Sequence, residues 1–335
     1  MPRLRRTSPD QPGWTRRAAG RGFVYLDEHG DRLSPEDAQR VKDLVIPPAW
    51  RDVWVSPYPN GHLQAVGTDD AGRRQYLYHP FWVEQRNALK HDRVLKFGQR
   101  LPKVRERLRE DLGTDELSQA QACAVAVKML DLGCFRIGND VYAEEYGSFG
   151  LTTLERRHVR REGDVMVFEF TGKSGIEHHV EIADPTVVEA LERMRRRRSS
   201  QDPALLVFRN GRGWRSLTPQ DVNGYVREVS GMDATAKDFR TWHGTVLAAA
   251  ALGAAVDKAT TKTARKRAVA AAMREVSDFL GNTPALARSA YVDPRVIDAF
   301  EEGKTIAPAL RRATGAPEEK QLVLERATLR LIRAA

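Results

Sequence analysis

A change of pattern at Pro80 is the feature that most constrains how this chain can fold. Between Phe23 and His79, short runs of strand-forming residues are separated by turn residues such as those at 68–72. Runs with this spacing favour an antiparallel sheet of hairpins. Beyond Pro80, apolar residues recur with a period of about 3.6 among many charges, which indicates helices. The sequence therefore predicts an α+β fold, with a small N-terminal antiparallel β module and a mostly α-helical second part.

Composition and pattern divide the chain into three segments. Residues 1–20 are rich in Arg, Pro and Gly and have almost no aliphatic side chains, so we expect a disordered basic arm. Residues 21–86 should form the β-rich module, and residues 87–335 the helical domain with one embedded hairpin. A length of 335 residues suits two folded domains.

Within the helical domain, turn residues and caps set the expected elements. The long pattern after Phe81 contains Pro102, at which it can divide into two helices. Ser118 is a suitable N-cap for an apolar helix that Gly133 ends. Two β-like runs flank Thr171 to Gly175 and predict the hairpin. Further helices are expected over 185–198, 218–230, 241–256, 262–280, 284–291 and 317–333.

Charge and cysteine content narrow the functional class. Lys and Arg number 54 against 45 Asp and Glu, a net charge of +9, which favours a polyanionic partner such as nucleic acid. Hydrophobic residues make up 41%, enough for a core. Cys123 and Cys134 are too few for a disulfide framework or a four-thiolate zinc site. The longest apolar run, 246–256, is too short to span a bilayer, so we expect a cytoplasmic protein without membrane contact.

The sequence contains neither a complete phosphate-binding loop nor a metal-binding histidine pair. Thr171 to Ser174 looks like the end of a phosphate loop, but Val167 stands where the first glycine belongs and no helix pattern follows. Lys173 is left at a glycine-flanked hairpin tip, either as a solvated turn lysine or as a cation that enters a DNA groove. His178 and His179 are adjacent, so they point to opposite faces of a strand and cannot chelate together. No metal site and no cofactor is expected.

Four scattered residues supply a complete set of groups for phosphoryl transfer to a tyrosine: Arg136, Lys173, Arg240 and Tyr291. Taken singly, each has an ordinary explanation, as a core tyrosine or a surface cation. Taken together, two guanidiniums can clamp the nonbridging phosphate oxygens, an ammonium can protonate a leaving alkoxide, and a phenol can attack.

The segments around these residues resemble type IB DNA topoisomerases of the small bacterial kind that is similar to the poxvirus enzyme. The resemblance covers nearly everything after residue 20, and order and spacing agree together. It is carried by Phe135-Arg-Ile-Gly-Asn-x-x-Tyr142 with Tyr146-Gly-x-x-Gly-Leu-Thr-Thr-Leu154, Thr171-Gly-Lys-Ser174, Lys237-Asp-Phe-Arg-Thr241, Ser289-Ala-Tyr-Val-Asp-Pro294 and Arg73-Arg-Gln-Tyr-Leu-Tyr78.

The resemblance implies the catalytic fold shared with tyrosine recombinases and a clamp around duplex DNA. It implies a Tyr291 nucleophile that forms a 3′-phosphotyrosyl link, strand rotation and religation without ATP or metal, with Arg136 and Arg240 stabilising charge and Lys173 as general acid. A monomeric, nucleoid-associated enzyme that prefers supercoiled DNA is expected. The implied DNA contacts are Gln75, Tyr76, Tyr78, Tyr142 and Lys237.

One position departs from the family pattern. The family often has a histidine nine residues before the nucleophile, where this chain has Asn282. An amide can also donate a hydrogen bond to a nonbridging phosphate oxygen, although it cannot carry charge. We therefore expect Asn282 to keep the role in altered form.

Two alternatives remain open at this point. A tyrosine recombinase usually has histidine three residues before its second catalytic arginine, and Lys237 at that position favours the topoisomerase. A non-catalytic basic DNA-binding protein would need no nucleophile at all. Should Tyr291 not be the nucleophile, Tyr142 and Tyr225 are the next candidates.

Overall fold

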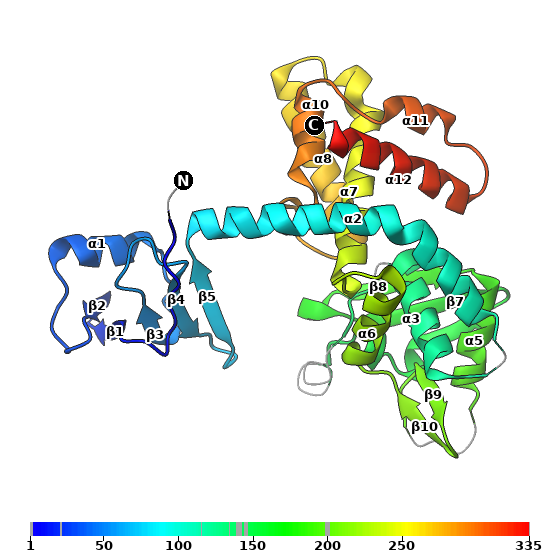
Figure 1. Ribbon diagram of the computed structural model, residues 1–335, viewed down its shortest axis with the longest axis horizontal. Helices are drawn as coiled ribbons and strands as arrows, with labels where there is room; N and C mark the ends of the chain where they lie inside the picture. The colour runs from blue at the N-terminus through cyan, green and yellow to red at the C-terminus, as the bar shows by residue number, and fades with distance from the viewer. Residues whose placement is uncertain are drawn as a thin grey trace. The chain divides into compact units, whose positions relative to one another are not determined.

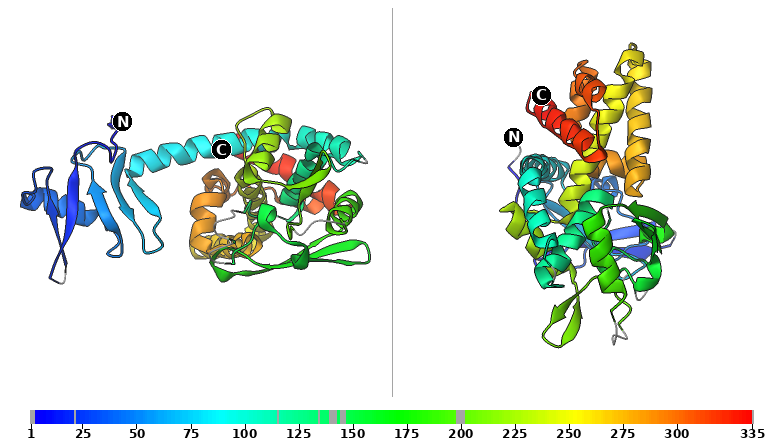
Figure 2. Two further views of the ribbon diagram at one scale, coloured as in Figure 1. Left: turned by 90° about the horizontal axis from the view of Figure 1, so that it is seen from below. Right: turned by 90° about the vertical axis from the view of Figure 1, so that its right-hand side faces the viewer.

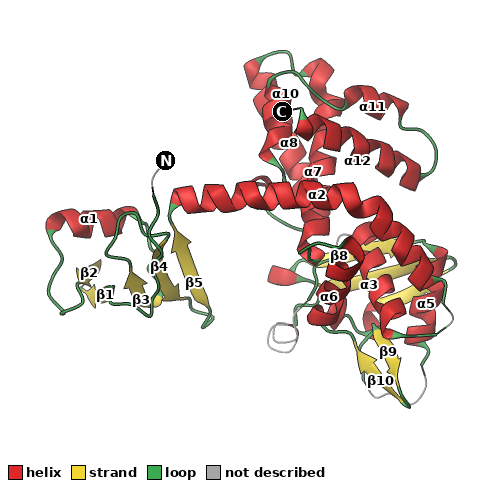
Figure 3. Cartoon of the chain, in the orientation of Figure 1, coloured by secondary structure: helices red, strands yellow, loops and turns green. Residues whose placement is uncertain are grey.

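The computed structural model describes residues 3–20, 22–114, 116–133, 135–138, 143, 147–197 and 202–334. The chain divides into two compact units, residues 1–90 and 91–335. Figure 1 labels the elements of both units, and Figure 3 colours them by secondary structure. The expected α+β fold, an antiparallel β module followed by a mostly helical region with a hairpin, is confirmed.

The described part of the first unit contains a five-stranded antiparallel sheet in the order β2-β1-β3-β4-β5. Its core is formed by buried Val41, Val53, Val55 and Ala65. The sequence pattern had indicated mainly strands here, and α1 was not foreseen although Ser34 caps it by accepting from the Asp37 N–H. The elements are β1 (Trp14–Ala19), β2 (Gly22–Leu26), α1 (Pro35–Asp43), β3 (Arg51–Val55), β4 (Leu63–Thr68) and β5 (Arg74–Tyr78).

The disorder expected for residues 1–20 does not hold for residues 14–19, because they form β1, which pairs with both β2 and β3. Two arginines of the 1–20 segment make specific contacts. Arg16 donates to the carbonyls of Pro47 and Trp50, and the Arg5 guanidinium lies 3.5 Å from the centre of the Tyr58 ring. Backbone pairing and cation–π contacts thus hold this segment in place although it has almost no aliphatic side chains.

Helix α2 (Pro80–Leu112) runs unbroken through Pro102, so the division into two helices did not occur. Pro102 is exposed, whereas Phe97, Leu101 and Val104 are buried on the opposite side. Packing of this apolar stripe against the core outweighs the loss of one backbone hydrogen bond.

In the second unit, a three-stranded sheet in the order β6-β7-β8 confirms the expected hairpin, with Lys173 at the turn between β7 and β8. A second hairpin, β9–β10, was not foreseen. The elements around the sheet are α3 (Gln119–Gly133), β6 (Val159–Glu162), β7 (Val165–Thr171), β8 (Glu177–Ile182), α5 (Pro185–Arg195), β9 (Val207–Asn210), β10 (Gly213–Ser216) and α6 (Pro219–Ser230).

Helix α7 joins two hydrophobic clusters. Its Trp242 and Val246 belong to the cluster that contains the sheet, and its Ala248 and Leu252 to the cluster formed by the C-terminal helices. Helices α7 and α8 lie side by side, and α12 packs on α7 and α10 (Figure 2). These elements are α7 (Ala236–Ala255), α8 (Lys262–Leu280), α9 (Pro284–Leu286), a π-helical turn (Ala287–Tyr291), α10 (Pro294–Glu301), α11 (Ala307–Arg312) and α12 (Pro317–Arg333).

Candidate active site

Tyr291 ends a π-helical turn, so the expected single helix over 284–291 is broken into α9 and this turn. The Val292 N–H donates to the carbonyl of Ala287 at 3.0 Å. On α7, the Thr245 hydroxyl donates to the Tyr291 carbonyl at 3.3 Å and accepts from the Asp293 N–H at 3.1 Å. The backbone on both sides of Tyr291 is therefore held against α7. π-helical turns occur frequently at functional sites.

Two cations from the start of α7 face the Tyr291 ring. The Arg240 guanidinium lies 5.4 Å and the Lys237 ammonium 5.9 Å from the ring centre. Burial raises the pKa of the Tyr291 phenol, but the charges of Arg240, Lys237 and Arg136 and a hydrogen bond from Arg240 outweigh it, so the pKa lies below its usual value. The site therefore stabilises the phenolate of Tyr291 relative to that of an ordinary tyrosine.

The loop at the end of α8 binds both predicted arginines. Arg240 Nη2 donates to the Leu280 carbonyl at 2.6 Å. Arg136 Nη2 donates to the Gly281 carbonyl at 2.6 Å and to Asn282 Oδ1 at 2.7 Å. Gly281 has φ +59°, which a glycine adopts without strain. Three consecutive residues thus orient two guanidiniums from α7 and from the segment after α3.

Asn282 and Arg136 also leave donors free at this loop. Among the described residues, Asn282 Nδ2 and Arg136 Nε are buried and have no hydrogen-bond acceptor. Because Oδ1 faces a guanidinium, the amide orientation is fixed and Nδ2 must point elsewhere. A buried donor without a partner costs about 1–3 kcal/mol, which an incoming anionic oxygen would relieve.

The structure brings together four of the five predicted catalytic residues, Arg136, Arg240, Asn282 and Tyr291, with Lys237, which was predicted as a DNA contact. It does not bring Lys173 to them. Lys173 is exposed at the hairpin turn, and within the described parts of the chain no hydrogen bond or ion pair ties it to Tyr291 or to the arginines. The role of the 280–282 loop was missed from the sequence, since carbonyl acceptors carry no residue-type signal.

The predicted DNA contacts on β5 fall on two faces. Tyr76 and Tyr78 are exposed on one face with their rings stacked, 6.1 Å between centres. Gln75 points the other way and donates to Asp69 at 2.9 Å. Tyr142 lies outside the described residues.

Comparison with known proteins now decides the class. Residues 80–307 match the family described as eukaryotic DNA topoisomerase I, catalytic core, and residues 22–69 match bacterial DNA topoisomerase IB, N-terminal domain. This chain belongs to the type IB DNA topoisomerases. It is therefore an isomerase of DNA, and relaxation is the activity of its family. The recombinase and the non-catalytic binding protein are set aside.

Curated relatives of this topoisomerase are viral. The DNA topoisomerase 1B of Acanthamoeba polyphaga mimivirus is 26% identical over 301 residues, which cover 86% of this chain and 88% of the relative. The DNA topoisomerase 1 of Rabbit fibroma virus (strain Kasza) is 23% identical, covering 81% and 84%. The DNA topoisomerase 1B of Vaccinia virus (strain Copenhagen) is 21% identical, covering 71% and 72%.

Tyr225, the alternative nucleophile, is unsuited to attack in this topoisomerase. Its side chain is buried, and its hydroxyl donates to Asp111 Oδ2 at 2.5 Å. Burial and the neighbouring carboxylate raise the pKa of its phenol well above the usual value. Tyr225 and Tyr291 therefore have opposite electrostatic surroundings.

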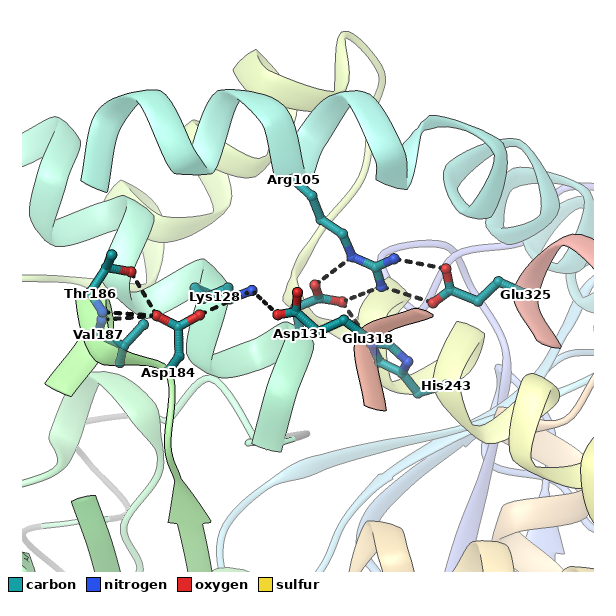
Figure 4. A network of polar contacts seen from close by, with 9 residues as sticks. All are labelled: Arg105, Lys128, Asp131, Asp184, Thr186, Val187, His243, Glu318 and Glu325. Atoms are coloured by element: carbon teal, nitrogen blue, oxygen red, sulfur yellow. Dashed lines mark hydrogen bonds and ion pairs between the residues drawn. The ribbon is translucent and has the colours of Figure 1, made fainter. Parts of the chain in front are cut away.

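A buried ion-pair network fixes the helices that carry the site (Figure 4). Arg105 on α2 donates to Asp131 on α3 at 2.8 and 3.0 Å and to Glu325 on α12 at 2.8 Å. His243 Nε2 on α7 lies 3.1 Å from Asp131 Oδ1. Burial raises the pKa of the Asp131 carboxyl, but the hydrogen bonds from His243 and Arg105 outweigh it and hold that pKa far below its usual range.

This network connects α3, which leads into Arg136, with α7, which carries Arg240. About one turn earlier on α3, Lys128 bridges Asp184 and Glu318 at 3.3 and 3.2 Å (Figure 4). The relative position of the two arginines therefore depends on charges that lie outside the site.

The described residues contain neither a cluster of metal ligands nor a helix able to cross a membrane. No three His, Cys, Asp or Glu side chains gather there in a way that could hold a metal ion. None of the described helices combines the length and apolar character that a membrane crossing requires.

Proposed function

We propose that this enzyme relaxes DNA by transient cleavage of one strand through Tyr291. The phenolic oxygen attacks a backbone phosphorus, the bond from phosphorus to the 5′ oxygen breaks, and a 3′-phosphotyrosyl link forms. The phenol gives its proton to solvent, and the Lys173 ammonium gives a proton to the departing 5′ oxygen. After strand rotation, the 5′-hydroxyl attacks the link, releases Tyr291 and restores the backbone.

The observation that carries the proposal is the pair of unused buried donors, Asn282 Nδ2 and Arg136 Nε, beside a tyrosine of lowered pKa. Arg136, Arg240 and Asn282 would bind the nonbridging oxygens of the phosphate and stabilise the charge that grows on them. Lys237 would assist Lys173 or contact a phosphate.

The same chemistry supports independence from ATP and metal. The phosphotyrosyl link keeps the energy of the phosphodiester, so religation needs no nucleotide. Guanidiniums supply the positive charge that a metal ion would otherwise provide.

The two units would have different roles in DNA relaxation. We propose residues 21–86 as a DNA clamp, with Gln75, Tyr76 and Tyr78 as contacts, and residues 87–335 as the catalytic domain, with Tyr142 as a further contact. The net charge of +9 supports phosphate binding along the duplex. A monomeric, cytoplasmic, nucleoid-associated bacterial enzyme that prefers supercoiled DNA fits this proposal.

The deciding experiment is relaxation of a supercoiled plasmid in EDTA without ATP, followed by denaturation to trap a covalent adduct. We expect relaxation and an adduct attached at the 3′ phosphate. A requirement for ATP or metal, or the absence of an adduct, would overturn the mechanism.

A further inference from the structure

A column of three rings connects the segment of Arg136 with β8. The His178 ring stacks on Phe170, with centres 5.0 Å apart and planes 17° apart. Phe170 stacks in turn on Phe135, at 5.9 Å and 16°. Phe135 directly precedes Arg136, and Phe170 lies on β7 just before the Lys173 turn. His178 therefore ends a rigid column that begins beside one of the site arginines.

The free edges of the same ring touch two glycine backbones. A Cβ added to Gly172 would lie 2.5 Å from His178 Cδ2, and one added to Gly281 would lie 2.8 Å from His178 Cε1. Both separations are too short for nonbonded carbon atoms, so the ring lies directly against both backbones. Gly172 precedes Lys173, and the Gly281 carbonyl accepts a hydrogen bond from Arg136. One side chain thus spans the lysine hairpin and the arginine-binding loop.

His178 also borders a cavity that the two site arginines line. His178 lines a cavity of about 410 Å³ together with Arg136, Arg240, Leu280 and Gly281, so its open side faces empty space. Burial and the charges of Arg136 and Arg240 lower the pKa of His178, which favours the neutral form of the ring.

We propose that His178 is a positioning residue that sets the distance between the Lys173 hairpin and the loop at 280–282. It acts through the backbone of Gly172 and makes no contact with the scissile phosphate. The inference rests on the proposed role of Lys173 as general acid. Without the ring, the hairpin turn can shift, and Lys173 then misses the 5′ oxygen although the arginines and Tyr291 are intact.

The first test compares single-turnover cleavage of two duplexes, one with the normal 5′ oxygen and one with sulfur at that position. Sulfur leaves without a proton, so it bypasses the general acid. A misplacement of about 1 Å can lower a rate on the order of 100-fold. We therefore expect His178→Ala to cleave the duplex with the normal 5′ oxygen roughly 10- to 100-fold more slowly than the wild type. On sulfur the loss should be below about threefold, because no proton is required.

The matched control is His179→Ala. His179 is the adjacent residue, faces the other side of β8, is exposed and pairs with Glu169 and Glu181. The His179→Ala variant should therefore cleave both duplexes at the wild-type rate. Equal losses on both duplexes for His178→Ala, while Lys173→Ala is rescued by sulfur, would overturn the inference. If sulfur does not rescue Lys173→Ala, the proposed acid is wrong, and the next test decides on His178 alone.

The second test perturbs the same contact at Gly172, and its single variant does not depend on how well His178→Ala folds. Gly172 has φ −96°, so alanine is tolerated there by the backbone and opposed by the ring. Gly172→Ala should slow oxygen cleavage as His178→Ala does. In the His178→Ala background the added methyl should cost less than about twofold, since residues in contact are not additive. If the rate losses of the two single variants multiply in the double variant, the ring does not act through Gly172.

Discussion

Asn282 accepts a hydrogen bond of 2.7 Å from Arg136 through Oδ1, while its Nδ2 is buried without an acceptor among the described residues. The amide is thus oriented by one site residue and keeps a donor available. This is the arrangement expected of a group that binds phosphate in place of the histidine common in the family.

We predict that removal of this donor by Asn282→Ala slows single-turnover cleavage by about tenfold to a hundredfold, since hydrogen bonds to charged partners contribute about 1.5–3 kcal/mol. Asn282→His should keep substantial activity, because imidazole can supply the same donor. Asn282→Asp should be badly impaired, since it places a negative charge beside the phosphate.

The opposing explanation is a purely local role, in which Asn282 only shapes the turn before α9. The N-cap of α9 is Thr283, whose hydroxyl accepts from the Leu286 N–H, so Asn282 would act only as a turn residue. Asp would then serve as well as Asn, because both are favoured in turns. A single-turnover comparison of the Asp and His variants decides, and a fully active Asp variant contradicts the phosphate contact.

Tyr291→Phe should abolish relaxation and the covalent adduct but leave duplex binding intact, since only the attacking oxygen is lost. Tyr225→Phe is the matched control, because it removes a buried hydroxyl that donates to Asp111. It should lower stability by about 0.5–3 kcal/mol and still relax plasmid. Relaxation near the wild-type rate by Tyr291→Phe would move the nucleophile elsewhere, with Tyr142 as the first position to examine.

Lys173→Ala should slow cleavage of normal DNA by roughly 10²- to 10⁴-fold, the usual contribution of a general acid. A duplex with sulfur in place of the 5′ leaving oxygen should recover most of this loss. Single-turnover rates on both duplexes give the answer. Equal losses would mean that Lys173 binds phosphate and gives no proton.

The elements that were predicted correctly from the sequence depend on local signals. The hairpin around Lys173 follows from glycine-flanked turn residues, and the helix at 262–280 from period and caps. The proximity of Arg240 and Tyr291 came from the resemblance in motif order, because residues so distant in sequence give no pattern of their own.

The errors have one physical cause, since tertiary contacts override local composition. β1 forms in a segment of disordered composition because Arg16 finds carbonyl partners far along the chain. α2 continues through Pro102 because its apolar stripe is buried. The 280–282 loop and the contact of His178 with Gly281 involve backbone atoms, which the sequence does not distinguish.

Salt should weaken DNA binding steeply. A protein with about six to ten phosphate contacts loses roughly 10³- to 10⁵-fold in affinity between about 50 and 200 mM salt, as condensed counterions are released. Relaxation should change from processive to distributive over this range. Binding is best measured with Tyr291→Phe, which cannot cleave, and a flat response to salt would contradict a clamp around the duplex.

Asp131→Asn should destabilise the protein in a pH-dependent manner. Breaking a buried ion pair costs about 3–5 kcal/mol, and here it leaves Arg105 with one carboxylate partner fewer. Because the pKa of Asp131 is lowered on folding, its stabilisation is complete above the unfolded value of about 3.9 and is lost as the pH falls toward the folded value.

The difference in Tm between the wild type and Asp131→Asn should therefore be largest near neutral pH and shrink in acid. Glu302→Gln is the control, since it breaks the exposed pair with Lys304 and should change Tm little at any pH. Relaxation by Asp131→Asn should also fall, because α3 and α7 hold Arg136 and Arg240 in place. A Tm difference that stays constant into acid would contradict a charged Asp131 at the centre of the network.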